Sequence, residues 1–314
     1  MSQAESALAV DGSMRWRRAV GADLPELAAF LKDGEERRVG FTGRLLREAK
    51  AELRLPSPLR GAVWLARPDA GSAGAVPAGA GSAGAQGPIL GAVLCHPSRL
   101  AFPVFPRSGV EYDRRFALLA SSFSPASAIG LSGDVERYEA ALRLSPRASV
   151  EYRLMAAAAA PPMRAPCAAA PDILVRRASA SDLEALLPLQ EAYEIEEVLT
   201  PIHRFNGSAC KASLARALER QLVYVAEEGG VVVGKAGTNA RGFCVDQIGG
   251  VYTLPSRRNR GVARAMMTSL LSDIAAQGRR TALFVKPGNA AATALYRSLG
   301  FEEIGDFRAD YFEA

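Results

Sequence analysis

The sequence has few of the residues from which metal centres and disulfide frameworks are built. Its 314 residues include four cysteines and two histidines, and no two cysteines form a Cys-x-x-Cys pair. Cysteine and histidine adjoin at Cys95-His96, but neighbouring residues of a strand point to opposite faces, which does not suit a nucleophile and its base. We therefore expect no metal site, and we expect reduced thiols in a cytoplasmic protein.

Long apolar runs and nucleotide-binding loops are missing as well. No run of 18 apolar residues predicts a membrane span, and Ser6–Val10 is too short for the apolar part of a signal peptide. Neither Gly-x4-Gly-Lys-Ser/Thr nor Gly-x-Gly-x-x-Gly occurs. The net charge of +5 is only mildly basic, and the binding of a small phosphorylated ligand would explain part of the excess of basic residues. We expect no nucleic-acid partner and no membrane association.

Two stretches of small residues divide the chain. Pro68–Gly87 consists mainly of Gly, Ala, Ser and Pro, and we expect a disordered loop over about 68–87. Alanines and prolines alternate over 156–171, which predicts a linker because prolines prevent a continuous helix. The chain is therefore predicted to have one domain at 1–155 and a second at 172–314.

The second part of the chain repeats the first. Arg17 and Asp23 are matched by Arg176 and Asp182, since 176 − 17 = 159 and 182 − 23 = 159, and the strand starting at Val63 has a counterpart 160 residues later. Ordered matches of this kind argue for two copies of one fold. The fold class we predict is α/β, with two mixed, mostly antiparallel sheets flanked by helices and arranged in tandem.

A basic turn lies between a predicted strand, Ile248–Leu254, and a predicted amphipathic helix, Ala263–Gln277. The first amides of a helix lack partners inside it and carry partial positive charge, so the turn is a candidate anion site. The residues from Arg258 to Ala263 fit Arg-x-x-Gly-x-Gly/Ala, and small side chains let the backbone approach a diphosphate closely. The residues expected to bind the anion are Arg258, Asn259, Arg260, Gly261, Val262, Ala263 and Arg264.

A second pair of residues lies on the next predicted helix, Ala290–Leu299. Asn289 stands at its N-cap position, and Tyr296 follows seven residues later. Seven residues return a helix to nearly the same face, roughly 10 Å further along. Asn289 and Tyr296 are therefore expected to line one side of an elongated ligand.

Together, Val251–Ala263 and Asn289–Phe301 resemble the GCN5-related N-acetyltransferase (GNAT) family. The resemblance implies that the arginine turn cradles the pyrophosphate of acetyl-CoA, the acyl donor. It implies that Val251, Tyr252 and Thr253 bind the pantetheine, and that Asn289 contacts the same molecule. It also implies that Tyr296 is the general acid that protonates the leaving thiolate after direct attack by a primary amine.

The sequence departs from the family pattern in two respects. Some members carry a glutamate base on the strand before the asparagine, where this chain has Phe284. The base is therefore left open among Asp246, Glu196, Glu197 and a water molecule. The first copy of the fold has no counterpart of the arginine turn or of Asn289 and Tyr296, and resembles a degenerate GNAT-like domain without productive acyl-CoA binding.

The acceptor amine is not defined by the sequence. Glu196, Glu197, Asn239, Asp246 and Tyr252 are candidate pocket residues, and the acidic ones suit an amine. A small molecule or a peptide remains open as acceptor, and the protein is expected to be a monomer or a homodimer. The alternatives are a non-catalytic acyl-CoA-binding or regulatory module and, within the enzymes, a small-molecule acetyltransferase similar to mycothiol synthase.

Overall fold

The computed structural model describes residues 14–52, 62–68, 87–105, 116, 123–157 and 172–312. These residues form two compact units. Unit 1 takes the described residues within Met1–Asp33, Glu48–Ser149 and Arg308–Glu313, and unit 2 takes those within Gly34–Arg47 and Val150–Phe307. The predicted loop at about 68–87 and the predicted linker at 156–171 lie almost wholly outside the described residues.

Unit 1 is built on a sheet in the order β1-β2-β3-β4-β5, antiparallel except where β4 and β5 run parallel. Aromatic rings fill its core, with Phe116 lying 4.6 Å from Trp16 and 6.1 Å from Tyr138 between ring centroids. The elements are β1 (Met14–Arg18), α1 (Leu24–Lys32), β2 (Ala62–Pro68), β3 (Gly91–Cys95), β4 (Leu100–Val104), β5 (Ser127–Leu131) and α4 (Ser132–Leu142). Helix α2 (Val39–Glu52) starts in unit 2 and ends in unit 1.

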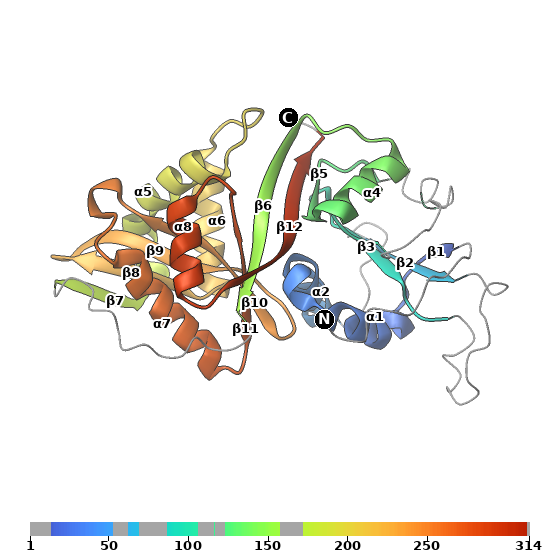
Figure 1. Cartoon of the computed structure of the whole chain (residues 1–314), viewed down its shortest axis with the longest axis horizontal. Coiled ribbons are helices and arrows are strands. Elements are labelled where there is room, and N and C mark those ends of the chain that lie inside the picture. The colour runs from blue at the N-terminus through green and yellow to red at the C-terminus, as the bar shows by residue number, and fades with distance from the viewer. Residues whose placement is uncertain are drawn as a thin grey trace. The chain divides into compact units, whose positions relative to one another are not determined.

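Unit 2 has the strand order β6-β11-β10-β9-β8-β7 (Figure 1). All neighbours are antiparallel except β10 and β11, which helix α7 connects in parallel. The strands are β6 (Ala148–Ala157), β7 (Ile173–Arg177), β8 (Val223–Glu228), β9 (Val231–Arg241), β10 (Val245–Thr253), β11 (Arg280–Val285) and β12 (Glu302–Tyr311). The helices are α5 (Leu183–Tyr193), α6 (Gly207–Arg220), α7 (Val262–Ala276) and α8 (Ala290–Ser298), with a π-helical turn at Glu194–Val198.

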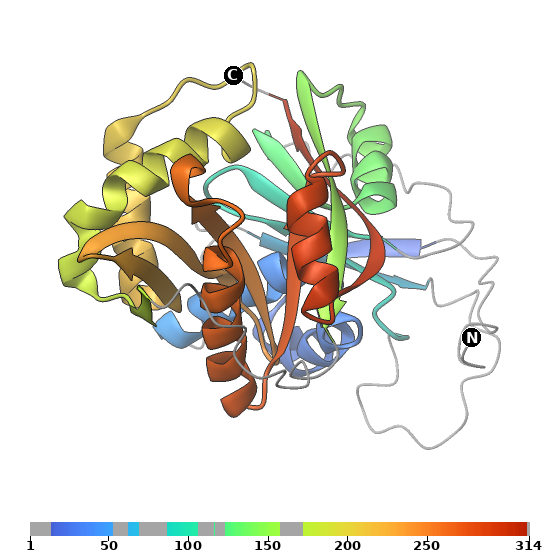
Figure 2. The same ribbon diagram turned by 60° about the vertical axis from the view of Figure 1, so that its left-hand side comes forward.

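Two pairs of helices cover opposite faces of the unit 2 sheet. Val233 packs in one cluster with Met266, Leu270 and Tyr296 of α7 and α8. Its neighbour Val232 packs in another cluster, with residues of α5 and α6. Successive strand residues point to opposite faces, so the two clusters lie on either side of the sheet. Figure 2 shows the yellow-green α5 and α6 separated from the red α8 by the orange strands.

The predicted repeat is visible in matching side-chain bonds. Arg17 Nη2 donates to Asp23 Oδ1 at 2.5 Å, and Arg176 Nη2 donates to Asp182 Oδ1 at 2.6 Å. In both copies the aspartate also accepts a backbone amide three residues earlier, and a helix starts at the next residue. The guanidinium thus lowers the pKa of both aspartates. The mixed, mostly antiparallel α/β class predicted in tandem is confirmed.

Two strands, β6 and β12, do not follow the domain division predicted from the sequence. Ala156 and Ala157, expected in the linker, end β6, which pairs with β11 from Val285↔Arg153 to Thr281↔Ala157. Strand β12 runs without interruption from Glu302 to Tyr311. The division at 155 and 172 stays a prediction, since β6 and β12 each contribute residues to both units.

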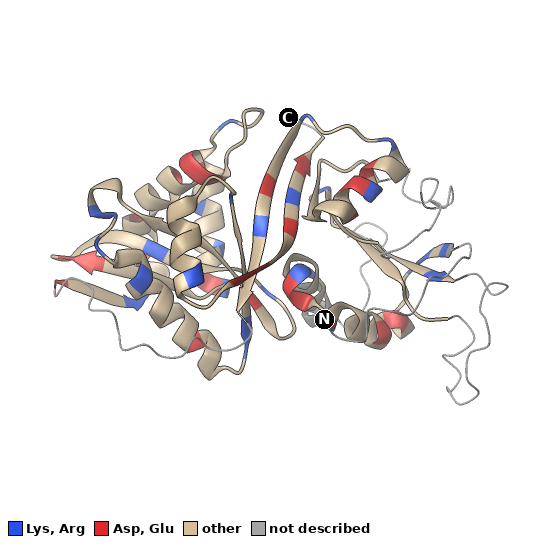
Figure 3. Ribbon diagram, in the orientation of Figure 1, with Lys and Arg blue, Asp and Glu red and all other residues tan. Residues whose placement is uncertain are grey.

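Charges of both signs are interleaved along the described ribbon, for example on β6 and β12 (Figure 3). This pattern agrees with the modest net charge of +5 and differs from a single-sign basic face. None of the helices in the described ranges combines the length and the apolar character needed to cross a membrane.

Candidate active site

The site begins where β10 leaves β11. Their parallel pairing ends at Ile248↔Leu283, so the following residues of β10 offer an edge to a ligand. On its other side β10 has a bulge, because three steps from Gly249 to Tyr252 match two steps from Gly237 to Lys235 on β9. Gly250 has a φ of 62°, a backbone conformation that favours glycine. The bulge thus starts at Gly249-Gly250, beside the edge that β10 offers.

Helix α7 points its N-terminus at the same place. Gly261 is the N-cap residue with a φ of 78°, and Asn259 also has a positive φ of 62°. No side chain caps the helix, so the first amides after Gly261 keep their hydrogen-bonding capacity for a ligand. A 15-residue helix adds its dipole to these amides. The turn therefore has the geometry of the anion site expected from the sequence.

The arginines of the turn have different partners. Arg258 and Arg264 border the pocket described below, and Arg264 Nη2 donates to Ser298 Oγ of α8 at 2.8 Å. Arg260 does not border it, and its Nη2 lies 2.9 Å from a Glu228 carboxylate oxygen on the β8–β9 hairpin. Arg257, which also pairs with Glu228, borders the pocket instead. The structure thus brings Arg258 and Arg264 together, and places Arg260 outside.

Glu196 fixes the position of Arg258. Its carboxylate accepts from Arg258 Nη2 at 2.8 Å and from the Tyr252 hydroxyl at 2.6 Å, and both bonds lower the pKa of Glu196. Arg258 Nε donates in addition to the Thr253 carbonyl at 3.1 Å. The guanidinium is thus held against the end of β10. The Tyr252 side chain is buried among residues of α5 and α6, so this tyrosine offers a ligand mainly its backbone.

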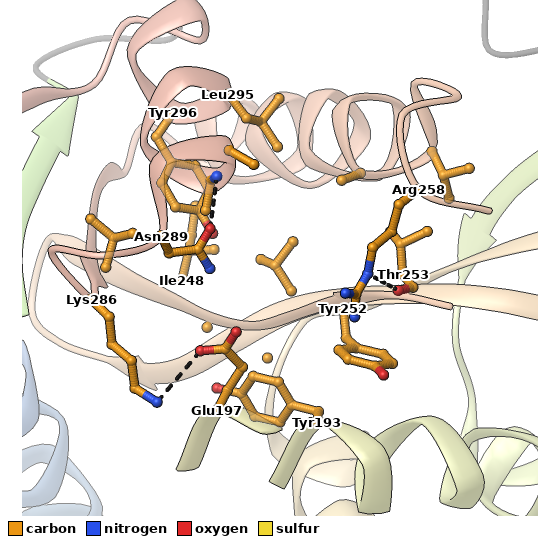
Figure 4. A pocket seen from close by; sticks show the side chains of 18 of the residues that line it. Tyr193, Glu197, Ile248, Tyr252, Thr253, Arg258, Lys286, Asn289, Leu295 and Tyr296 are labelled. Carbon is orange, nitrogen blue, oxygen red and sulfur yellow. Dashed lines mark hydrogen bonds and ion pairs between the residues drawn. The ribbon is translucent and has the colours of Figure 1, made fainter. Parts of the chain in front are cut away.

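A pocket of about 700 Å³ opens between β10, β11, α7 and α8 in unit 2. In Figure 4, Arg258 lies at one end of it and Asn289, Tyr296, Glu197 and Tyr193 gather at the other. This volume accommodates a small-molecule ligand. The predicted site residues that line it are Val251, Tyr252, Thr253, Arg258, Asn259, Gly261, Val262, Ala263, Arg264, Asn289 and Tyr296.

Asn289 and Tyr296 lie on one side of α8, as their spacing predicted. Asn289 caps the helix, since its Oδ1 accepts from the Ala292 amide at 3.0 Å while its Nδ2 keeps two N–H donors. Tyr296 is only 7% exposed. Burial, with further contributions from Tyr193 and Glu197, raises the pKa of the Tyr296 hydroxyl. Tyr296 is therefore protonated at neutral pH and available as a proton donor.

The candidate bases are now distinguished by position. Asp246 is fully buried and accepts from Arg279 Nη2 at 2.7 Å and from Arg241 Nε at 3.2 Å, away from the pocket. Glu196 is bound to Arg258 and Tyr252. Glu197 borders the pocket, where one of its oxygens lies 3.6 Å from Lys286 Nζ. Among the three carboxylates considered from the sequence, Glu197 is the one that the structure brings to Tyr296.

Sequence reasoning missed several lining residues. Tyr193 ends α5, and its hydroxyl is hydrogen-bonded to the backbone of Gly250. Lys286 follows β11 directly, and Tyr152 reaches the pocket from β6. No local pattern marks Tyr152, because its place depends on strand pairing with residues far away in the sequence.

Comparison with known proteins agrees with this geometry. Residues 190–301, all within unit 2, match the acetyltransferase (GNAT) family. An 89-residue stretch is 37% identical to the N-alpha-acetyltransferase RimI of Mycobacterium tuberculosis, covering 27% of this chain and 55% of RimI. Unit 2 is therefore similar in sequence to the GNAT family. The chain spans only about half the length of this curated relative.

Solved structures extend the likeness in fold beyond unit 2. A Drosophila protein superposes with a TM-score of 0.63 at 11% identity, covering 95% of this chain and 99% of that one. A tandem GNAT protein from the clavulanic acid biosynthesis pathway has a TM-score of 0.55 at 12% identity, covering 96% and 99%. At such identities the likeness concerns the fold alone. It supports a tandem arrangement in which unit 1 is the GNAT-like partner of unit 2.

Proposed function

We propose that this protein is an N-acetyltransferase that moves the acetyl group of acetyl-CoA to a primary amine. The observation that carries the proposal is the pocket of unit 2. It joins an end built from arginines and helix amides to an end built from a protonated tyrosine and a carboxylate. An elongated, anionic acyl donor and a basic acceptor fit these two ends.

The residues present suit acetyl-CoA as the donor. The diphosphate fits the amides that follow Gly261, with Arg258 and Arg264 adding charge-assisted hydrogen bonds. The peptide-like pantetheine fits the edge of β10 over Val251–Thr253, where pairing with β11 has ended. The Asn289 side-chain amide, at the start of α8, is then placed to contact the pantetheine as well. This order places the thioester at the end of the pocket that holds Tyr296.

The chain's own groups provide for the steps of acetyl transfer. The acceptor nitrogen attacks the thioester carbonyl, and Glu197 takes its proton directly or through water. A backbone amide of the β10 edge donates to the carbonyl oxygen as negative charge develops there. The C–S bond breaks, and Tyr296 donates its proton to the departing sulfur. Tyr296 is protonated at neutral pH, so its proton is present when the thiolate forms.

The test is the Tyr296→Phe variant, assayed by thiol release from acetyl-CoA with an amine panel. We expect turnover to fall about 100-fold, the scale of general acid catalysis, with the dissociation constant of acetyl-CoA unchanged. Tyr224→Phe is the matched control, because Tyr224 lies outside the pocket and bonds to Asp273 at 3.3 Å. Equal turnover in Tyr296→Phe would remove this residue from the mechanism.

The same assay separates the remaining candidates. The similarity to RimI favours the α-amino group of a polypeptide as a second type of acceptor, so the panel includes short peptides. Binding of acetyl-CoA without thiol release for any amine or peptide would identify a non-catalytic acyl-CoA-binding module instead.

A further inference from the structure

An aromatic wall lies beside the reacting end of the pocket. Phe284 of β11 stacks on Phe307 of β12, with ring centroids 3.9 Å apart and planes inclined by 20°. Tyr152 of β6 lies 6.2 Å from Phe284 at 45°. Phe284 and Tyr152 both border the pocket, while Phe307 is buried behind them. The wall thus consists of two accessible rings supported by a third.

Strand pairing fixes the wall in place. Phe284 is the first residue of β11 after Leu283, the last one to pair with β10. It lies opposite Leu154 on β6, so Tyr152, two residues away, is on the same face. The rings therefore border the pocket where β10 and β11 part.

Charge complements the apolar surface. The carboxylate of Glu197 and the hydroxyl-bearing ring of Tyr193 border the same pocket. An ammonium group is attracted both by a carboxylate and by the faces of aromatic rings. Arginines and backbone amides recognise the polar parts of the proposed acetyl-CoA donor. The aromatic wall is therefore left to contact the acceptor.

We propose that the wall formed by Phe284, Phe307 and Tyr152 is the acceptor subsite and that it selects a primary amine carried by an aromatic group. The ring of the acceptor stacks on Phe284, and its amino group lies between Glu197 and the thioester. Phe284 is thus a specificity-determining residue. This inference rests on the proposed acetyl transfer.

The experiment compares 2-phenylethylamine with ethanolamine in the full chain, with saturating acetyl-CoA. Both amines have an aminoethyl stem, which carries a phenyl ring in 2-phenylethylamine and a hydroxyl group in ethanolamine. We expect kcat/KM to be at least tenfold higher for 2-phenylethylamine, mainly through KM, because stacking and burial of the ring stabilise its complex. Phe284→Ala should abolish this preference by lowering kcat/KM for 2-phenylethylamine much more than for ethanolamine.

Two further variants keep the outcome interpretable. Phe284→Leu retains an apolar side chain and should keep part of the preference, which a general loss of folding would not do. Phe205→Ala removes an exposed phenylalanine outside the pocket and should change neither amine. Equal kcat/KM values for the two amines, or an equal loss for both in Phe284→Ala, would overturn the proposal.

A binding measurement separates this inference from the proposed function. Saturation-transfer NMR with protein saturated with coenzyme A reports contact of the 2-phenylethylamine ring without turnover. Ring contacts that vanish in Phe284→Ala support the subsite even if no thiol is released, in which case acetyl transfer fails and the subsite stands. Absence of ring contacts in the wild-type chain would overturn the subsite.

Discussion

Lys235 is a buried cation directly beneath the β10 bulge. Its side chain is 4% exposed, its Nζ donates to the Gly250 carbonyl at 3.0 Å, and it lies 4.4 Å above the centre of the Tyr193 ring. Tyr193 in turn is hydrogen-bonded to the backbone of Gly250. Lys235 and Tyr193 thus hold Gly250 between them, which orients the strand edge on which the proposed thioester site depends.

Desolvation lowers the pKa of Lys235 to about 7, against opposing contributions from Glu194 and Cys210. The unfolded chain, with the ordinary value of 10.5, binds more protons between pH 7 and 10.5. The free energy of unfolding therefore rises with pH through this window, and the cost of the buried charge applies in full below pH 7. We predict that Lys235→Met raises the free energy of unfolding by roughly 2–4 kcal/mol over the wild type at pH 6. The lost hydrogen bond to Gly250 subtracts from this gain, and the gain becomes smaller by pH 9.5.

Urea unfolding of the wild type and Lys235→Met at both pH values checks this prediction. Lys211→Met is the control, since Lys211 is exposed and pairs with Glu184 at 2.6 Å. A stability difference for Lys235→Met that is the same at pH 6 and pH 9.5 would contradict a titrating Lys235.

At the scale of elements, a short helical turn at Glu35–Arg37 fastens the loop between β9 and β10. Glu35 is fully buried, and its carboxylate accepts from the amides of Phe243 at 2.5 Å and Cys244 at 2.8 Å. Gly242 leaves room for this contact, because a Cβ there would lie 2.3 Å from Glu35 Oε1 and 2.4 Å from Thr42 Oγ1. The turn thus anchors the strand that leads into the active-site bulge.

We predict that Gly242→Ala destabilises the protein by about 1–3 kcal/mol, since the added methyl group forces a buried carboxylate from its two amides. Thermal unfolding measures the loss. Gly133→Ala serves as control: a Cβ at that helical glycine meets nothing within 4 Å, so stability should stay level or rise slightly. The prediction fails if both substitutions leave the melting temperature unchanged.

Elements with local signals could be predicted from the sequence. Helix α7 was expected at 263–277 and spans Val262–Ala276, because its apolar stripe and the glycines at both ends are local features. The placement of Asn289 and Tyr296 on one side of α8 could likewise be predicted from helical spacing. The aromatic wall was out of reach, since Tyr152 meets Phe284 only through pairing of β6 with β11. The choice of Glu197 over Asp246 also needed side-chain partners that spacing does not reveal.

In unit 1, Gly130–Gly133 joins β5 to α4. In the element order of unit 2 that position corresponds to the junction of β11 and α8, where Asn289 lies. Asp134, at the β5–α4 junction, accepts from the Phe105 amide at 3.0 Å.

At the scale of the whole molecule, the two units share a fold and differ in chemistry. Unit 2 combines the parted strands, the α7 turn and Tyr296 in one pocket. At the β5–α4 junction of unit 1, Asp134 accepts from the Phe105 amide, whereas Asn289 at the start of α8 borders the pocket of unit 2. The residues that line the described pocket thus all belong to unit 2.

We therefore predict that each chain binds one molecule of acetyl-CoA, in unit 2. Isothermal titration should give a stoichiometry of one. Arg258→Glu should weaken binding at least tenfold, since it removes a charge-assisted bond to the diphosphate and sets a carboxylate against it. Arg15→Glu, on β1 of unit 1, is the matched charge reversal and should leave affinity unchanged. A second site that persists in Arg258→Glu would show that unit 1 also binds the donor, and the assignment of one active site per chain would be wrong.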